Sequence, residues 1–165
     1  MTVDRRGTRK GVRLTGALAA LAVLGSTLAA CSSPPAKSGS TPGTTAPLKA
    51  AVLYAHDSNI GTVLVVGYGS IVYATTAESK NHVSCTGACT KTWLPIATSG
   101  KPVNGGGLER KLMGTVTRPD GSLQATYAGH PLYVYRGQKT GLLANAQGSG
   151  GVWFAVLPDG ALLHG

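Results

Sequence analysis

The sequence predicts an all-β fold in which two tandem repeats of about fifty residues, made of short antiparallel strands and hairpins, pack as one domain. Glycine accounts for 24 of the 165 residues and aromatic residues for only 5%, a composition that favours strands and turns over a helical bundle. Short runs rich in Val, Ile, Tyr and Thr are separated by turn residues, as expected of strands. Finally, 51–100 aligns with 111–160 at an offset of sixty residues without a gap.

The first thirty residues have the features of a secretory signal. A basic stretch, MTVDRRGTRKGVR, precedes the uncharged run LTGALAALAVLGSTLAA, and small residues end the run, as in signal peptides. The run ends in Leu-Ala-Ala followed by Cys31, which matches the lipobox at which bacterial lipoproteins are lipidated and cleaved. We therefore expect a signal peptide at 1–30 and a lipid on Cys31. A single transmembrane anchor is the alternative, although the run is at the short limit for a hydrocarbon core of ~30 Å.

The residues that follow the signal, 31–50, are rich in Ser, Thr, Pro and Gly and lack a hydrophobic period. Such a segment cannot bury enough apolar surface to fold, so we predict a flexible tether between the membrane and a folded domain at 51–165. The formal net charge is +9, but five of the fifteen basic residues lie in the signal and the others are scattered singly. Nucleic-acid binding requires clustered basic residues, so the expected partner is the membrane, and no nucleic acid.

The strands of each repeat can be placed in order. In the first copy, 51–100, we expect strands at AVLYA, TVLVVG and SIVYAT, and in the second copy, 111–160, at KLMGTV, SLQATY and PLYVY. Gly69 and Gly129 would supply the positive φ of the hairpin turns. A last short strand, ALLHG, would follow the turn at 158–160, and GACTKTWL would form one or two helical turns. Because two hairpins alone are marginally stable, the copies are expected to fold as one unit.

With these segments assembled, the chain resembles a family of bacterial secreted-repeat lipoproteins of undetermined function. The resemblance rests on SIVYATTAE, SCTGACTKTWLP, TRPDGSLQATYAGHPLYVY and GSGGVWFAVLPDG. The family has a tandem Tyr-x4-Asp motif and a Cys-x-Gly-x-Cys segment that leads to Trp-Pro-Pro. This chain departs from both, because the acid positions after Tyr73 and Tyr133 carry Glu78 and Gln138, and Leu94 follows the tryptophan. Paired acids that bound a cation or basic ligand would therefore bind it weakly here.

Two tryptophans keep the sixty-residue offset together with the two tyrosines of that motif. Trp93 aligns with Trp153 as Tyr73 aligns with Tyr133. Aromatic residues in short strands are more often packed in a core or a hairpin than exposed as a ligand platform. We therefore expect these four side chains to be interior.

Cys85 and Cys89 form the sharpest local motif. In an exported protein, two cysteines at this spacing indicate a disulfide, and Gly87 gives so small a ring the backbone freedom it needs. A metal site is the alternative, in which His82 joins the two cysteines, although structural zinc requires four ligands. A redox role is less favoured, because exchange catalysts typically have Cys-x-x-Cys.

No signature of an enzyme is present. The sequence lacks a Gly-x-Ser-x-Gly elbow, a phosphate loop and a His-Glu-x-x-His motif. The histidines at 56, 82, 130 and 164 are expected to be solvated residues of turns or of the chain end. We predict a non-enzymatic, lipid-anchored protein on the extracytoplasmic face of the cell membrane, without a cofactor, that binds a protein or small molecule not identified by the sequence or supports the envelope. A metal-binding or electron-transfer accessory protein is the alternative, and an unrecognised hydrolase a distant third.

Overall fold

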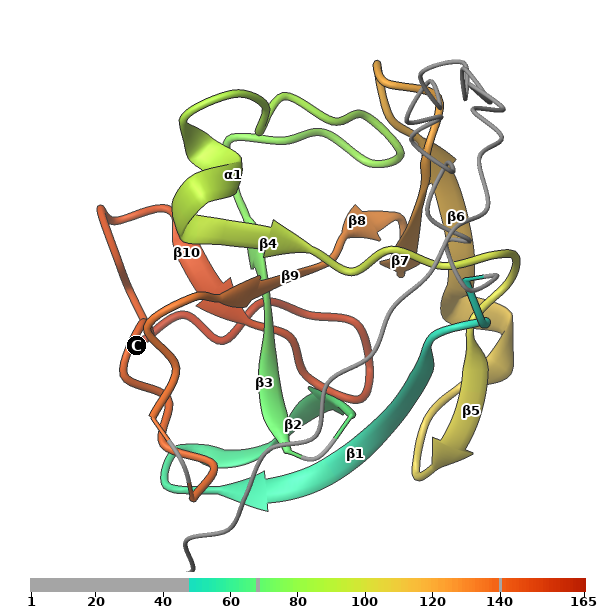
Figure 1. The fold of residues 1–165 in the computed structure, drawn as a ribbon. Helices are drawn as coiled ribbons and strands as arrows, with labels where there is room; N and C mark the ends of the chain where they lie inside the picture. The colour runs from blue at the N-terminus through green and yellow to red at the C-terminus, as the bar shows by residue number, and fades with distance from the viewer. Residues whose placement is uncertain (1–47, 68, 140) are drawn as a thin grey trace, which may run out of the picture. The chain divides into compact units, whose positions relative to one another are not determined.

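The computed structural model describes residues 48–67, 69–139 and 141–165, and within them short strands dominate (Figure 1). The strands are β1 (Val52–Ser58), β2 (Gly61–Val66), β3 (Ser70–Thr75), β4 (Trp93–Pro95), β5 (Val103–Gly106), β6 (Met113–Thr117), β7 (Leu123–Tyr127), β8 (His130–Pro131), β9 (Tyr133–Tyr135) and β10 (Trp153–Ala155). One helical turn, α1 (Cys89–Thr92), and one 3-10 turn (Arg110–Leu112) accompany them. The predicted all-β class is therefore confirmed, while the predicted signal, lipidation site and tether lie outside the described residues.

The strands form two sheets. Seven strands make the larger sheet in the order β4-β9-β3-β2-β1-β5, with β10 also paired to β3, and β6-β7-β8 make the smaller sheet. All pairings are antiparallel apart from that of β1 with β5. β3 runs through the centre of the molecule (Figure 1) and is buried along Ile71–Thr75. Its near-continuous apolar run IVYA is the pattern expected of a strand covered on both faces.

The strand pairings follow the sixty-residue offset seen in the sequence. In the ladder between β4 and β9, Trp93 pairs with Tyr135. In the ladder between β10 and β3, Trp153 pairs with Thr75. Trp153 lies sixty positions after Trp93, and Thr75 lies sixty positions before Tyr135, so the two pairs correspond. Each short tryptophan strand therefore completes an edge of a strand in the other segment. The two ladders therefore pair positions that correspond at the sixty-residue offset.

The core consists of two clusters, and both draw on the two segments. Strands β2 and β3 contribute to both clusters because alternate residues of a strand point to opposite faces of the sheet. The first cluster includes Leu53, Leu64, Val72, Met113, Ala125, Tyr127, Leu132 and Val156. The second includes Val63, Val65, Ile71, Tyr73, Trp93, Tyr133, Trp153 and Ala155. Burying one such large apolar side chain stabilises the fold by about 1.5–3 kcal/mol.

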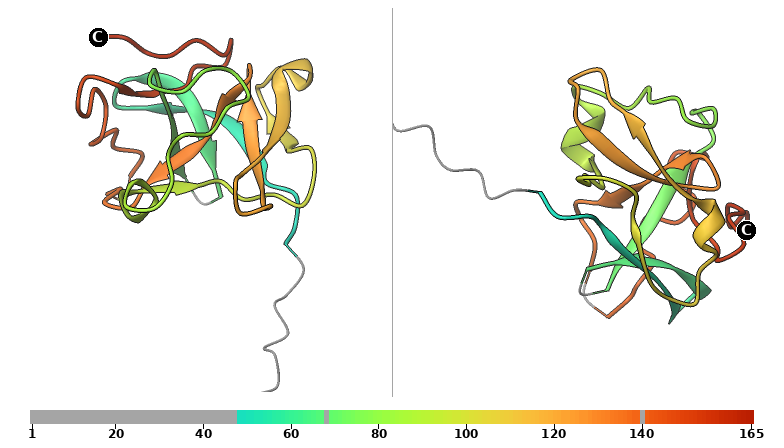
Figure 2. Two further views of the ribbon diagram at one scale, coloured as in Figure 1. Left: turned by 90° about the horizontal axis from the view of Figure 1, so that it is seen from above. Right: turned by 90° about the vertical axis from the view of Figure 1, so that its right-hand side faces the viewer.

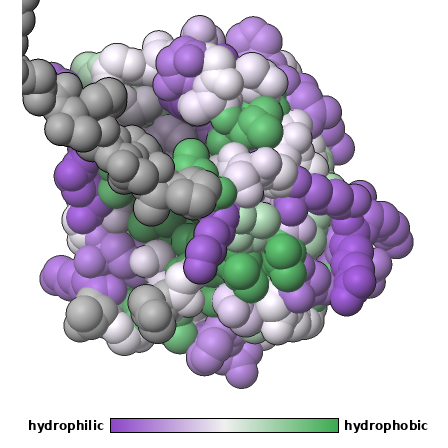
Figure 3. Space-filling view, turned by 45° about the vertical axis from the view of Figure 1, so that its right-hand side comes forward, coloured by the Kyte–Doolittle hydropathy of each residue, from purple (hydrophilic) through white to green (hydrophobic). Residues whose placement is uncertain are grey.

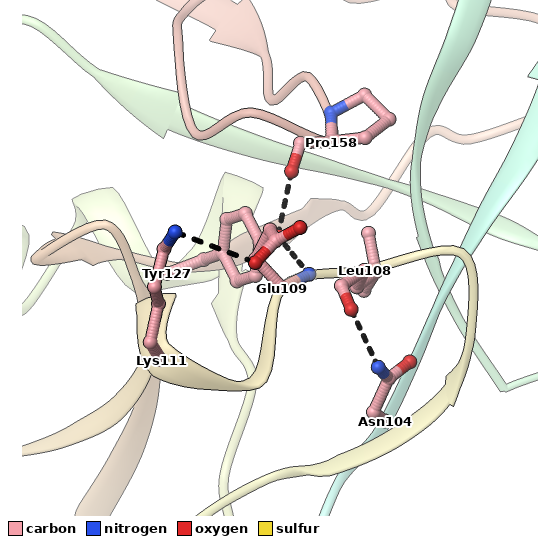
Figure 4. Close-up of polar contacts among 6 residues, drawn as sticks. All are labelled: Asn104, Leu108, Glu109, Lys111, Tyr127 and Pro158. Atoms are coloured by element: carbon pink, nitrogen blue, oxygen red, sulfur yellow. Dashed lines mark hydrogen bonds and ion pairs between the residues drawn. The ribbon is translucent and has the colours of Figure 1, made fainter.

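Tyr127 links three segments at the edge of the first cluster (Figure 4). Its hydroxyl oxygen accepts the backbone N–H of Glu109 at 2.9 Å and donates to the carbonyl of Pro158 at 2.6 Å. The Asn104 side-chain amide donates to the carbonyl of Leu108 at 2.6 Å. These bonds fasten the connection between β5 and β6 to β7 and to the C-terminal turn.

The predicted C-terminal strand ALLHG is wrong. After β10, the chain turns at 158–160 and returns to make an isolated bridge between Val156 and Leu162, together with a hydrogen bond from the N–H of Leu163 to the carbonyl of Ala155. The turn is held by the Asp159 carboxylate, which accepts the backbone N–H of Ala161 at 2.9 Å. Gly160 takes a φ of +89°, and a Cβ added there would lie 2.4 Å from the Cβ of Ala128. The segment then continues along the outside of the domain (Figure 2), and its one bridge does not extend into a strand.

Within 48–67, 69–139 and 141–165, no helix has the length and apolar character needed to cross a membrane.

Candidate functional site

The predicted disulfide is present. Cys85 and Cys89 are bonded, with their Cα atoms 5.3 Å apart, and Gly87 between them takes the positive φ of +54° that the small ring requires. The helical turn α1 begins at Cys89. Cys85 is buried in the second core cluster, so the bridge ties the connection between β3 and β4 to the core.

The structure does not assemble the alternative metal site. Both sulfur atoms are engaged in the disulfide, and His82 is exposed in a turn. In the described part of the chain, no group of three or more His, Cys, Asp or Glu side chains is placed to hold a metal ion. Thiolate ligation by Cys85 and Cys89 would therefore require reduction of the bond first.

The four aromatic residues that keep the sixty-residue offset meet at the centre of the second cluster. Trp93 and Trp153 stack with ring centroids 3.9 Å apart and planes 8° from parallel. Tyr73 packs edge-on against Trp93, and Tyr133 packs edge-on against Trp153. All four are at most 8% exposed. They form interior packing and present no open surface to a ligand.

Glu78 lies beside this cluster and is buried, with 6% of its surface exposed. Its Oε1 accepts the backbone N–H groups of Ser84 and Cys85, at 2.7 and 2.8 Å, and the Tyr133 hydroxyl at 2.9 Å. Burial, to which the negative charge of Glu78 adds, raises the pKa of Tyr133 to about 12. The carboxylate thus fastens the disulfide loop to the core.

The equivalent position of the second segment is different. Gln138 Oε1 and Tyr73 Oη are buried, and neither has a hydrogen-bond partner among the described residues. Burial raises the pKa of Tyr73, an effect that the nearby backbone of Ala146 opposes. Gln138 Nε2 donates instead to the carbonyl of Leu143 at 3.0 Å. The glutamine therefore supports the loop that follows β9 and leaves an acceptor unused.

Glu78 and Tyr133 belong to a buried polar cluster that includes two further residues, Arg118 and Gln124, which local sequence patterns do not predict. Arg118 and Gln124 are buried and hydrogen-bonded to each other, and Arg118 Nη2 donates to the carbonyl of Cys85 at 2.8 Å. Gln124 Nε2 donates to the carbonyl of Leu132 at 2.8 Å. The sequence carries no signal for this pairing, because an arginine before Pro-Asp-Gly is normally an exposed turn residue.

A cavity of about 810 Å³ lies across one face of the larger sheet. It extends over neighbouring strands from β1 through β2, β3 and β9 to β4, and the segment after β9 closes one side. The cavity is lined by Tyr54, Ala55, His56, Val65, Gly67, Gly69, Ser70, Leu94, Val134, Tyr135, Arg136, Gln138, Lys139, Gly141 and Leu142. The sequence did not predict this cavity, because its two sides lie about eighty positions apart in the chain.

Two glycines fix the aromatic rings of this cavity. A Cβ added to Gly105, in β5, would lie 2.0 Å from Cε1 of Tyr54, and one added to Gly137 would lie 2.6 Å from Cε1 of Tyr135. Each ring therefore rests directly against a glycine backbone, a close approach that requires the missing side chain. Leu142 closes the cavity from the other side and packs against Gly69.

Two of the four histidines lie in strands, where residues of turns or of the chain end were predicted, although His56 is exposed as predicted. His56 lies in β1 and lines the cavity, and His130 lies in β8. Burial, and then the charge of Lys80, lower the pKa of His130. Both histidines occupy positions in antiparallel ladders, which local turn residues alone could not indicate.

Comparison with known proteins gives one match, to a protein family. No curated protein and no solved structure matches the chain. A family model matches the part of the chain that contains β7, β8, β9, β10 and most of β6, which is most of the second segment. The match supports the family assignment of this segment but does not test the Tyr-x4-Asp motif, whose acid positions are changed here. Residues 114–157 match the family described as a secreted repeat of unknown function.

Proposed function

We propose that this protein is an exported lipoprotein of the cell envelope whose β-domain binds a small molecule in the cavity across the larger sheet. The observation that carries the proposal is the cavity itself. Its volume of about 810 Å³ lies within the ~300–1,000 Å³ typical of small-molecule sites. Its walls combine aromatic and aliphatic side chains with a few polar groups, as such sites do.

The cavity is also a better candidate for a binding site than the exposed apolar residues of the surface. On the face shown in Figure 3, hydrophobic surface forms patches separated by hydrophilic side chains. Among the described residues, the large hydrophobic side chains that are exposed are Leu48, Val103 and Leu143, from separate parts of the chain. Extended apolar patches mark protein-binding surfaces, and three exposed residues do not amount to one.

Binding without catalysis is supported by the position of the buried polar cluster. Glu78, Arg118 and Tyr133 would be the natural candidates for acid-base chemistry, yet they are at most 7% exposed. Their hydrogen bonds go to backbone groups of the disulfide loop and to one another. A substrate could not reach them without opening the core, so we assign this cluster a structural role.

The location rests on the similarity to a secreted repeat, on the disulfide, which persists in oxidising compartments, and on the sequence before the domain. The proposal includes lipidation of Cys31 and a lipid anchor on the extracytoplasmic face. The test is metabolic labelling with radioactive palmitate. The wild-type protein should carry label in the membrane fraction, and Cys31→Ala should carry none and remain as precursor or be released. Label in the Cys31→Ala protein would exclude this site of attachment.

We further propose that the domain consists of two tandem copies, 51–100 and 111–160, that fold only together. The reciprocal ladders β4–β9 and β10–β3 support this proposal, because each copy alone would lack a strand. A fragment of residues 48–105 should show neither a cooperative thermal transition nor dispersed amide resonances. Either feature in that fragment would contradict the proposal.

Binding can be tested with N-phenyl-1-naphthylamine, an uncharged probe that fluoresces in apolar surroundings. The protein to use is the mature chain with Cys31→Ser, which carries no lipid. Leu142→Trp should fill the cavity and remove the fluorescence enhancement, because Leu142 forms one of its walls. Leu143→Trp is the matched control, because its side chain is exposed and does not line the cavity. Failure of the wild-type chain to bind the probe, or equal binding by both variants, would refute the proposal.

A further inference from the structure

The charged groups around the cavity are of one sign. Arg136 and Lys139 line it, and among the described residues of its lining there is no Asp or Glu. The two cations stand on the segment after β9, while the opposite wall is built from the apolar and aromatic side chains of β1 and β2, including Tyr54 and Val65. The cavity therefore has a cationic rim and an apolar wall.

Arg136 is held in place from its far side. Its backbone N–H donates to the carbonyl of Thr92 at 2.9 Å, and its Nε donates to the carbonyl of Lys91 at 2.6 Å. In the described part of the chain, no hydrogen bond or ion pair engages its two Nη atoms. A guanidinium oriented through Nε keeps the paired N–H groups that bind a planar anionic group.

The third polar side chain of the rim is already turned toward the protein. Gln138 lies between the two cations in sequence and also lines the cavity. Its Oε1 is buried, and its Nε2 donates to the carbonyl of Leu143 at 3.0 Å. The side chains of the rim that can bind an anionic group are therefore Arg136 and Lys139.

From this arrangement, we infer that the ligand is an amphiphilic organic anion, such as a carboxylate with an aromatic or long aliphatic body. The anionic group would lie between Arg136 and Lys139, and the apolar body would lie over the sheet against Tyr54 and Tyr135. This inference rests on the proposed binding function and adds the chemical class of the ligand. It requires no covalent step.

The test compares two probes with the same apolar body on the mature chain with Cys31→Ser. 8-Anilinonaphthalene-1-sulfonate is anionic, and N-phenyl-1-naphthylamine is its uncharged counterpart. The double variant Arg136→Gln, Lys139→Gln should weaken binding of the anionic probe about tenfold, the effect of two modest ionic contacts, and leave the uncharged probe within about twofold. Raising the salt concentration should weaken only the anionic probe. Lys49→Gln, Lys101→Gln, which removes two exposed cations outside the cavity, should change neither.

The outcomes separate the two proposals. If the uncharged probe binds but the rim variant leaves the anionic probe unchanged, the cavity binds ligands and the inferred anion selectivity is overturned. If the control variant weakens the anionic probe instead, the anion binds elsewhere and the inference is equally overturned. If neither probe binds the wild-type chain, the proposed binding function itself fails. Displacement of the anionic probe by dissolved dodecanoate supports a free carboxylate, whereas displacement only by phosphatidylglycerol vesicles assigns the same anionic chemistry to membrane lipid.

Discussion

Replacement of Glu78 by alanine tests the central structural claim, that its buried carboxylate locks the disulfide loop to the core. The side chain is 6% exposed, and its Oε1 accepts hydrogen bonds from the backbone N–H groups of Ser84 and Cys85, from the Tyr133 hydroxyl and, at 3.5 Å, from the Ser84 hydroxyl. The substitution would leave the N–H of Cys85 and the hydroxyl of Tyr133, both buried, without this acceptor. The N–H of Ser84 belongs to an exposed residue, so water can replace its partner there.

The expected loss of stability follows from these contacts. A buried donor left without an acceptor costs about 1–3 kcal/mol, so the two buried donors predict a loss of about 2–6 kcal/mol. That is a large fraction of the ~5–15 kcal/mol by which a domain is normally stable. Glu78→Gln retains an oxygen in the Oε1 position and loses mainly the charge, so its loss should be smaller, about 1 kcal/mol.

The equivalent position in the second segment supplies the matched control. The one side-chain donor of Gln138 makes bonds only to backbone carbonyls on exposed loop residues, and its oxygen makes none with the described residues, so Gln138→Ala should cost less than about 1 kcal/mol. Urea unfolding of the oxidised proteins at neutral pH measures all three variants, with an unchanged slope as the criterion for comparing midpoints. If Glu78→Ala loses no more than Gln138→Ala, the carboxylate does not hold the loop.

Three further predictions concern stability. The double substitution Cys85→Ser, Cys89→Ser should lower the free energy of unfolding by about 2 kcal/mol, because the bond closes a short loop. The intact mass of the wild-type chain should be two hydrogens below that of the reduced chain, and recovery of two free thiols would contradict the disulfide. The pKa of Tyr133 is about 12 in the folded state, above the ~10 of an exposed tyrosine. The unfolded chain therefore releases this proton first, and stability should fall from pH 10 to 12 by up to about 1.4 kcal/mol per pH unit. Tyr133→Phe should make that fall shallower, and an unchanged pH profile would count against it. Gly160→Ala should cost about 2–4 kcal/mol of stability, because the added Cβ would clash at a positive φ. Gly121→Ala is the control, because Gly121 has open space around it, and it should cost about 1 kcal/mol. Equal losses of the two variants in thermal unfolding would exclude the clash.

The sequence predicts the strands where local residue preference and tertiary pairing agree. The runs TVLVVG and SIVYAT coincide with β2 and β3 to within one residue. In contrast, GACTKTWL reads as a helical segment, and its helical turn ends at Thr92 because Trp93 pairs with β9. β5 was not predicted, since half of its residues are glycine and its parallel partner β1 is about fifty positions away. In these elements, tertiary context decides the state.

The same distinction applies to the sites. The Cys85–Cys89 disulfide depends on two residues in one loop, so their spacing was sufficient to predict it. The cavity depends on β1 and the segment after β9, which only the strand order β9-β3-β2-β1 brings together. Arg118 reads as a surface residue for a similar reason, because its partners Gln124 and the Cys85 carbonyl are assigned by the fold.

The sixty-residue correspondence holds in the core and fails at the rim of the cavity. The tyrosines and tryptophans that are identical in the two segments meet one another in the core, where a change in one would disturb the other. The rim residues Arg136, Gln138 and Lys139 have no such constraint, and sixty positions earlier the chain carries Thr76, Glu78 and Ser79. Glu78 in the first segment binds the disulfide loop, whereas Gln138 at the equivalent position of the second segment lines the cavity. The interior aromatic residues are the same in the two segments, whereas the residues after β3 and β9 differ, so selectivity in the proposed binding function should depend on Arg136 and Lys139.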